Sequence, residues 1–325
     1  MHRTLFSLLL IAALTSVRAQ DSLLDLLGEQ ETIEYTDASF KTSRVINSHS
    51  LENTAHGVLD FKIGHRFGFL NLGPVEAFGL DQATIRLGLD YGLTDRIMVG
   101  IGRSSYQKTV DGFVKYKFLR QCKSGCHIPL TAALVAGMTT TTVAKENTWW
   151  YDESRTDYYT HRLGYNFQLI MGRKFSDNFS LQLMPGMIHR NLIRSAKEQH
   201  DVMNIGAAGR VKLTNRLAIN AEYFYVLPGQ LYGDNLTEEQ LNDPNPGFHN
   251  SLSIGFDIET GGHVFQLHFT NSTAMYERGV ITETTGDWLN GDIHFGFNIS
   301  RVFTLHRPKP KEPKPARKRK KDGVG

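Results

Sequence analysis

The sequence predicts an all-β protein whose strands close into an antiparallel transmembrane β-barrel of about 12 strands, with short turns at one end and longer loops at the other. The first observation is the hairpin pattern of residues 251–272, in which apolar side chains fall at every second position over 252–258 and again over 265–269. A repeat of two residues is typical of a strand with one apolar face. Soluble sandwiches and membrane barrels share this pattern, so the rest of the chain must decide which medium that face contacts.

The second observation is that the same alternation recurs along the chain from Gly57 onward. The strands are expected at residues 59–63, 85–91, 97–101, 114–118, 130–138, 163–171, 181–183, 203–207, 217–225, 252–258, 265–269 and 289–303. Several of them approach the ~10 residues that a tilted membrane strand needs, which exceeds the ~5–6 residues usual in soluble sheets.

The third observation is that two classes of connection alternate along the chain. Short connections lie at 92–95, 176–178, 214–216 and 259–262, with a slightly longer one at 122–126. Long polar connections lie at 69–81, 104–111, 145–157, 190–200, 229–249 and 271–287. This alternation is typical of an outer-membrane barrel with periplasmic turns and external loops, whereas a sandwich has no reason to sort its connections in this way.

The start of the chain predicts export and leaves a barrel as the way to cross a membrane. Arg3 precedes an apolar run over 5–14, and Val17-Arg18-Ala19 is a small-residue cleavage pattern, so residues 1–19 are expected to be a signal peptide. No later run offers the ~18 uncharged apolar residues of a membrane helix, and the mean hydropathy is -0.31. Residues 57–306 are expected to form the barrel, since closed barrels are the other structure that satisfies the backbone in lipid.

The two flanking segments are predicted from composition. Residues 20–56 begin with helical apolar spacing and have no evident strand partner, so they form either a plug or a periplasmic N-terminal segment, and the ordinary extension is favoured. Residues 307–325 are Pro/Lys-rich and are expected to be a disordered basic periplasmic tail.

The formal net charge of +3 hides a partition between the tail and the body. The tail has nine Lys or Arg residues against Glu312 and Asp322, so the body from Gln20 to His306 is net acidic. The overall basicity therefore gives no support to nucleic-acid binding. The expected partners are outer-membrane lipid around the barrel and, through the tail, an anionic periplasmic surface or protein.

The inward face of the predicted barrel carries many ionisable side chains. Burying them in a dry soluble core would be prohibitive, because an unpaired buried charge costs several kcal/mol or more. The candidates for the lumen are Lys62, Arg66, Arg86, Lys115, Lys117, Arg162, Arg210, Asp257, His268, Asp292 and His294. Basic side chains exceed acidic ones on this face, so the sequence predicts a narrow pore with a mild preference for anions, carried above all by Arg86 and Arg162.

Several stretches resemble one family of bacterial proteins. They are YTDASFK (35–41), VINSHS (45–50), LDFKIGHRFG (59–68), FGLD (78–81), YGLTD (91–95), VGIGRSS (99–105) and DGFVKY (111–116). The family is catalogued as a domain of unknown function, number 5777 in that series, and the resemblance extends over most of the mature chain. It implies an outer-membrane barrel of the kind found in Bacteroidetes and transfers no catalytic residues. The paired cysteines and the basic tail are not part of the family's common pattern.

The cysteines Cys122 and Cys126 are predicted to form a disulfide. His127 follows them and invites comparison with covalent haem attachment, but the spacing is one residue too long and no axial partner is evident. In an oxidising compartment two cysteines this close more often pair with each other. No cofactor is therefore expected.

Two further constellations are weighed against simpler explanations. Ser48-His49-Ser50 raises the possibility of a barrel that hydrolyses lipid, but these residues are expected on the periplasmic side and no nucleophile motif accompanies them. His268 and His294 beside Asp292 would suit a metal, although solvated lumen histidines are commoner. The favoured function is passage or binding of a small polar solute. A non-conducting adaptor barrel that recruits a periplasmic partner is the alternative, and a lipid hydrolase is less favoured.

Overall fold

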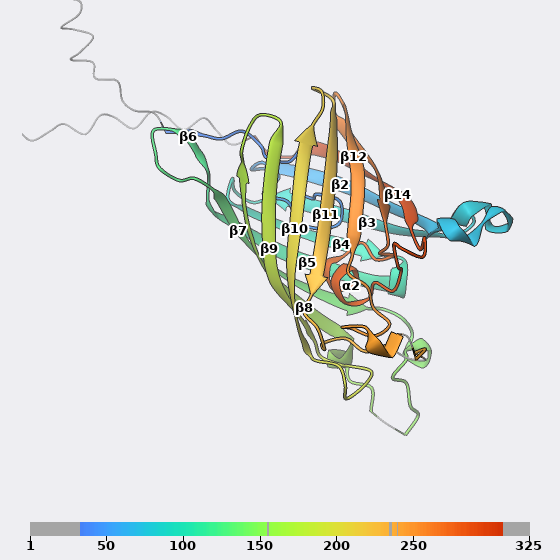
Figure 1. Ribbon diagram of the computed structural model, residues 1–325. Helices are drawn as coiled ribbons and strands as arrows, with labels where there is room; N and C mark the ends of the chain where they lie inside the picture. The colour runs from blue at the N-terminus through green and yellow to red at the C-terminus, as the bar shows by residue number, and fades with distance from the viewer. Residues whose placement is uncertain (1–32, 155, 234–235, 239, 308–325) are drawn as a thin grey trace, which may run out of the picture.

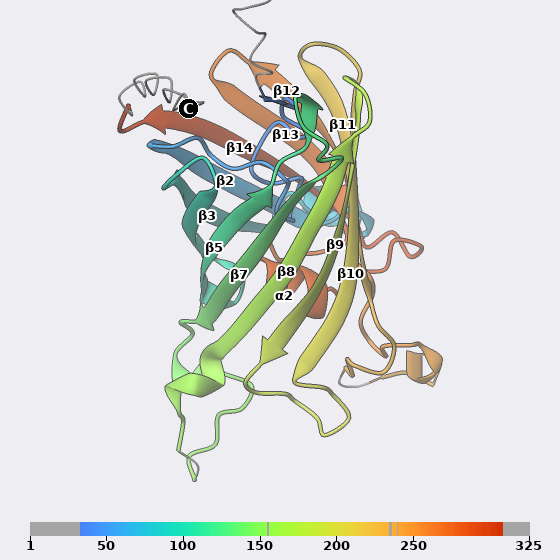
Figure 2. The same ribbon diagram turned by 90° about the vertical axis from the view of Figure 1, so that its left-hand side faces the viewer.

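A computed structural model describes residues 33–154, 156–233, 236–238 and 240–307 and shows a closed barrel of antiparallel strands (Figures 1 and 2). The barrel strands are β2 (Val58–Phe69), β3 (Ala83–Gly92), β4 (Ile97–Ser104), β5 (Thr109–Leu119), β7 (Thr131–Thr141), β8 (Leu163–Lys174), β9 (Phe179–Arg190), β10 (Asp201–Lys212), β11 (Leu217–Val226), β12 (Leu252–Thr260), β13 (His263–Thr270) and β14 (His294–Thr304). Each pairs with its neighbours along the chain, and β14 pairs with β2 to close the ring. The predicted fold class is confirmed.

The register of the strands sends alternate side chains to opposite faces of the wall. Phe256 on β12 lies opposite Leu267 on β13, and both point outward with about two fifths of their surface exposed. Leu87 and Leu89 on β3 do the same, while Asp90 between such positions is fully buried. The outer face is thus an apolar belt, which is the surface that contact with lipid requires.

The connections define two ends of the barrel. The short turns join β3–β4, β8–β9, β10–β11 and β12–β13 at what we call the turn end, where β2 also begins and β14 ends. The longer β5–β7 connection lies at the same end. The remaining connections form the loop end, and one of them contains the helix α2 (Glu277–Thr282). Within the described residues no helix is both long and apolar enough to cross a membrane.

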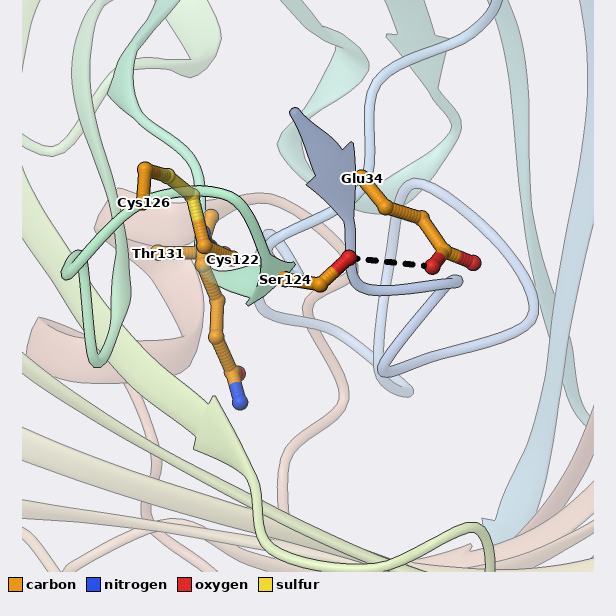
Figure 3. The surroundings of a disulfide bond; sticks show 6 residues. Glu34, Cys122, Ser124, Cys126 and Thr131 are labelled. Atoms are coloured by element: carbon orange, nitrogen blue, oxygen red, sulfur yellow. Dashed lines mark hydrogen bonds between the residues drawn. A yellow bond between two sulfur atoms is a disulfide. The ribbon is translucent and has the colours of Figure 1, made fainter. Parts of the chain in front are cut away.

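The β5–β7 connection at the turn end carries a small sheet of its own. Its strand β6 (Cys122–Ser124) pairs with β1 (Glu34–Tyr35) from the start of the described chain. Cys122 and Cys126 are joined by the predicted disulfide, and the hydroxyl of Ser124 donates a hydrogen bond to Glu34 beside it (Figure 3). The sheet therefore ties the N-terminal segment to the rim of the barrel.

The segment that follows β1 enters the barrel from the turn end and fills part of its interior. We call residues 39–54 the plug. They form a hairpin in which Arg44 bridges His49, the N–H of Val45 donates to the carbonyl of Ser48, and Leu51 is fully buried. Of the two arrangements that the sequence leaves open for this segment, the structure has the plug rather than the favoured periplasmic extension. The signal peptide predicted at 1–19 and nearly all of the tail predicted at 307–325 fall on residues 1–32 and 308–325, which lie outside the described residues.

A second segment reaches into the barrel from the loop end. It is the β13–β14 connection with α2, which contacts β8, β9 and β11 and lies behind β8 and β9 in Figure 2. Its side chains Tyr276, Val280 and Ile281 are buried. They pack with apolar side chains that point inward from β8–β11, namely Ile170, Met184, Ile188, Val202, Phe224 and Val226. The sequence predicts a polar interior throughout the barrel. The structure differs here, because these inward positions form an apolar core around α2.

Candidate functional site in the plugged lumen and the loop-end vestibule

The tip of the plug is held by one carboxylate of the barrel wall. Glu222 on β11 is 2% exposed and accepts hydrogen bonds from the backbone N–H groups of Ile46 (3.3 Å), Asn47 (2.8 Å) and Ser48 (3.0 Å). The hydroxyl of Ser48 donates a fourth bond of 2.6 Å. Successive backbone amides in a turn form a concavity suited to an anion, and hydrogen bonds to an ionised acceptor are stronger than neutral ones.

Other wall side chains satisfy the remaining polar groups of the plug. The ammonium of Lys115 donates to the carbonyls of Ser50 and Glu52, both at 2.5 Å. Arg66 donates to the side-chain oxygen of Asn47 (2.6 Å), and Asp90 accepts from the hydroxyl of Ser43 (2.9 Å). Similar bonds run from Gln266 to the Val45 carbonyl and from Gln182 to the His49 carbonyl. These side chains therefore bind the plug, whereas the sequence predicts that they are solvated and line a pore.

The predicted lumen residues fall into three groups. Those that point into the filled interior are Lys62, Arg66, Arg86, Lys115, Lys117, Arg210, Asp257 and His268. Several of them form ion pairs: Arg86 with Asp111 (Nε–Oδ1 2.9 Å), Lys62 with Asp60 (2.7 Å), and Lys117 with Glu52 (3.6 Å).

His294 forms the second group. It is buried at the loop end and hydrogen-bonds to the Phe67 carbonyl (2.7 Å) and the Thr273 hydroxyl (2.9 Å). His294 therefore bonds to protein groups at the loop end and does not form one site with His268.

Two predicted lumen residues lie outside the lumen, which corrects the expectation for them. Asp292 sits at the outer rim, where it accepts from the side-chain amide of Asn71 (2.6 Å) and from the N–H of Asp287 (3.1 Å). Arg162 ends a short 3-10 helix before β8 and pairs with Asp157 (3.0 Å). Both precede the first residue of a strand, so the two-residue alternation does not apply to them. With Arg86 paired and Arg162 elsewhere, the predicted anion-selective ring is not present.

The plug and α2 meet at a buried cluster that we call the latch, made of Arg44, His49 and Glu277. Arg44 forms an ion pair with Glu277, and Nε2 of His49 lies 3.1 Å from Oε1 of the same carboxylate. All three side chains are less than one tenth exposed. The loop end and the turn end are thus connected through one carboxylate in the middle of the barrel.

Protonation of His49 is expected to loosen the plug. Burial, and then the positive charges of Arg44 and Lys115, hold the pKa of His49 well below its usual value of about 6.5. An undocked plug therefore binds a proton at a pH where the docked plug does not, so docking is complete above about pH 6.5 and weakens as the pH falls below it. The Glu277 carboxylate lies 3.1 Å from the His49 ring, and the pKa of His49 is lowered in its presence.

The measurement is protease cleavage within the plug of the folded barrel between pH 7.5 and about 5. We expect cleavage to accelerate on the acid side in the wild type and to change little with pH in His49→Gln, which cannot be protonated. His127→Gln, an exposed histidine at the turn end, is the control. Equal pH profiles for the wild type and His49→Gln would contradict the prediction.

On the loop-end side of α2 the loops enclose a cavity of about 630 Å³, which we call the vestibule. Four arginines line it, namely Arg162, Arg190, Arg194 and Arg278, together with Glu198 and Glu283. Trp149, Trp150 and Tyr106 supply aromatic surface. Burial raises the pKa of Tyr106 to about 12, so this phenol stays neutral and can donate a hydrogen bond. From the sequence these stretches are predicted only as polar loops, although the arginines in 190–200 and 271–287 are a usable signal.

The Ser48-His49-Ser50 run lies in the plug and not on the periplasmic side where the sequence places it. Ser48 donates to Glu222, and the His49 ring packs edge-on against Phe113 at 4.3 Å. In the described part of the chain no group of three His, Cys, Asp or Glu side chains is arranged to hold a metal ion.

A closed barrel with an apolar outer belt, short turns at one end and long loops at the other defines an outer-membrane β-barrel, here with a plug from its own N-terminal segment. The chain belongs to the family described as a membrane bound beta barrel domain, DUF5777, whose model matches residues 40–303. The resemblance noted from the sequence is confirmed. The family match and the closed barrel place the protein in the outer membrane of a Gram-negative bacterium, and we take the turn end as periplasmic and the loop end as external.

Several solved outer-membrane proteins are similar to this chain at low sequence identity. An outer membrane channel from Pseudomonas putida F1 is 12% identical over 78% of this chain and 98% of its own, with a TM-score of 0.40. The outer membrane protein Omp33 of Acinetobacter baumannii is 10% identical over 75% and 97%, with a TM-score of 0.36. The monoaromatic hydrocarbon channel CymD is 9% identical over 78% and 90%, with a TM-score of 0.34. No curated protein sequence matches the chain.

Proposed function

We propose that the protein is a gated barrel that binds a small polar solute at its external face and admits it when the plug moves. The observation that carries this proposal is the way the plug is held. Its tip is bound by Glu222, and its carbonyls are bound by Lys115. Contacts of this kind hold the plug in the lumen, yet they are hydrogen bonds between the plug and the inner wall, which can be exchanged for hydrogen bonds to water when the plug withdraws.

The position of α2 supports the same proposal. It separates the vestibule from the plug, with Arg278 lining the vestibule and Glu277 in the latch. A solute that binds in the vestibule can therefore alter the ion pair between Glu277 and Arg44, since Glu277 and Arg278 are adjacent in one short helix. A ligand shifts such an equilibrium only by binding one arrangement more tightly than the other.

The test is to lock the plug to the wall. The side-chain amide of Asn47 donates to the hydroxyl of Ser253 on β12 at 3.0 Å, so Asn47→Cys with Ser253→Cys places two thiols at the plug tip. In planar bilayers under applied voltage we expect discrete openings in the wild type, none in the oxidised double variant, and openings again after mild reduction. Each single cysteine variant under the same reductant is the control, because reduction also opens Cys122–Cys126.

The adaptor function remains a second candidate because of one observation. Among the described residues, β1 and β6 at the periplasmic end pair only with each other, so the outer edge of each strand is unpaired. A free sheet edge can receive an extended peptide. If neither the wild type nor variants that release the plug show channel openings, the gated barrel is contradicted and the adaptor is favoured.

A further inference from the structure

We infer that the vestibule binds a solute with a six-membered ring that carries an anionic group, as in a sugar carboxylate or a sugar phosphate. This inference rests on the proposed function in taking the solute to arrive from outside, and it names the class of solute. The cavity of about 630 Å³ lies within the range of small-molecule sites, about 300–1,000 Å³. It is built from external loops and the floor provided by α2, so a solute reaches it without crossing the membrane.

Two arginines at the floor have hydrogen-bonding capacity that the protein does not use. Arg190 pairs with Glu198 at 2.9 Å, and Arg278 pairs with Glu283 at 3.2 Å. In the part of the chain that the structure describes, the Nε–H of each arginine is buried and has no hydrogen-bond partner. A buried donor without an acceptor is unfavourable, and an anionic oxygen that enters the cavity would remove that penalty.

The same two arginines lie close together because of a glycine in the wall. Gly164 on β8 is opposite Arg190 on β9 in the ladder. A Cβ atom at Gly164 would lie 2.7 Å from Cδ of Arg278, so the side chain of Arg278 passes directly over this position. The unpaired Nε–H groups of these two arginines can therefore donate to the oxygens of a carboxylate or phosphate.

The aromatic side of the vestibule provides the surface for a ring. Trp149 and Trp150 lie edge-to-face with their ring centres 5.3 Å apart, and Trp149 is 47% exposed. Arg194 lies over the Trp149 ring at 5.3 Å and Arg162 over the Trp150 ring at 5.8 Å. Exposed indole faces stack on flat or weakly polar rings, and arginine beside them favours an electron-rich ligand. Among the lining residues arginines outnumber carboxylates, which selects anions over cations.

The experiment measures binding alone, so that it fails or succeeds separately from conductance. Tryptophan fluorescence of the full-length folded barrel in detergent is titrated with glucuronate, glucose 6-phosphate, benzoate and glucose. We expect saturable quenching with the two anionic sugars and at least tenfold weaker binding of glucose. Benzoate distinguishes an aromatic acid from a sugar: an affinity equal to or above that of glucuronate would overturn the sugar class.

The variants assign the site to the floor arginines. Arg278→Gln and Arg190→Gln are each expected to weaken glucuronate binding at least tenfold, and Gly164→Ala is expected to weaken it by displacing Arg278. Arg216→Gln, an exposed arginine in the β10–β11 turn at the opposite end, should bind as the wild type does. All variants are first checked for the folded band in unheated SDS gels. Saturable binding that is unchanged in Arg278→Gln and Arg190→Gln, or no saturation with any of the four compounds, would overturn the inference.

Discussion

Replacing Glu222 by Ala is expected to open the barrel. The substitution leaves the amides of Ile46, Asn47 and Ser48 and one hydroxyl without their acceptor. Hydrogen bonds to charged groups contribute about 1.5–3 kcal/mol each, so losing this set should favour withdrawal of the plug strongly. The open fraction should rise at least about 100-fold, since each 1.4 kcal/mol changes an equilibrium constant tenfold.

Single-channel recording in planar bilayers provides the measurement, with protease cleavage in residues 39–54 as an independent readout of plug release. Glu153→Ala, which removes an exposed carboxylate from an external loop, is the matched control. A Glu222→Ala barrel that is as closed and as resistant to protease as the wild type would contradict the prediction. The plug would then be held by Lys115 and its apolar contacts, and Glu222 would be dispensable.

Replacing Arg86 by Met is expected to destabilise the barrel wall more than any surface change. Arg86 on β3 and Asp111 on β5 are both nearly fully buried and form a two-pronged ion pair across β4. Removing one partner of such a pair leaves a buried charge and costs about 3–5 kcal/mol. Replacing both partners by apolar side chains is often neutral, so Arg86→Met with Asp111→Val should recover much of the loss.

The measurement for the Arg86 variants is the temperature at which the folded band in SDS gels converts to the unfolded band. A closed barrel keeps every strand paired and resists SDS until heated. We expect a clearly lower conversion temperature for Arg86→Met and a partial return for the double variant. Equal conversion temperatures for the single and double variants would show that the pair itself is not the source of the stability.

The strands were predictable from the sequence because their environment is simple. Each meets lipid on one face and the interior on the other, and this contrast writes a two-residue repeat from Leu59 to Phe303. The same rule failed at Arg162 and Asp292, which lie just before β8 and β14, where the pleat has not begun. The two-residue alternation tells which face of the wall a side chain is on only for residues within a strand.

The plug and the vestibule were beyond this kind of prediction for a physical reason. The plug satisfies its backbone through side chains far away in the chain, such as Glu222 and Lys115, so residues 39–54 show no local period. The vestibule depends on segments brought together by closure of the barrel, with Arg190 supplied by the end of β9 and Arg278 by α2. Long-range contacts of this kind leave no signature in the spacing of residues.

The grip of Glu222 on the plug has a consequence for how this sequence can change over generations. The carboxylate binds main-chain amides, which every residue except proline provides, so the grip at positions 46 and 47 does not depend on which side chain is present. Mutational drift at the tip is therefore constrained by fit to the surrounding wall and by the exclusion of proline, and not by the need to keep one particular donor. Within these two limits, relatives that retain the carboxylate can change the side chains at positions 46 and 47 and keep the main-chain bonds that hold the plug.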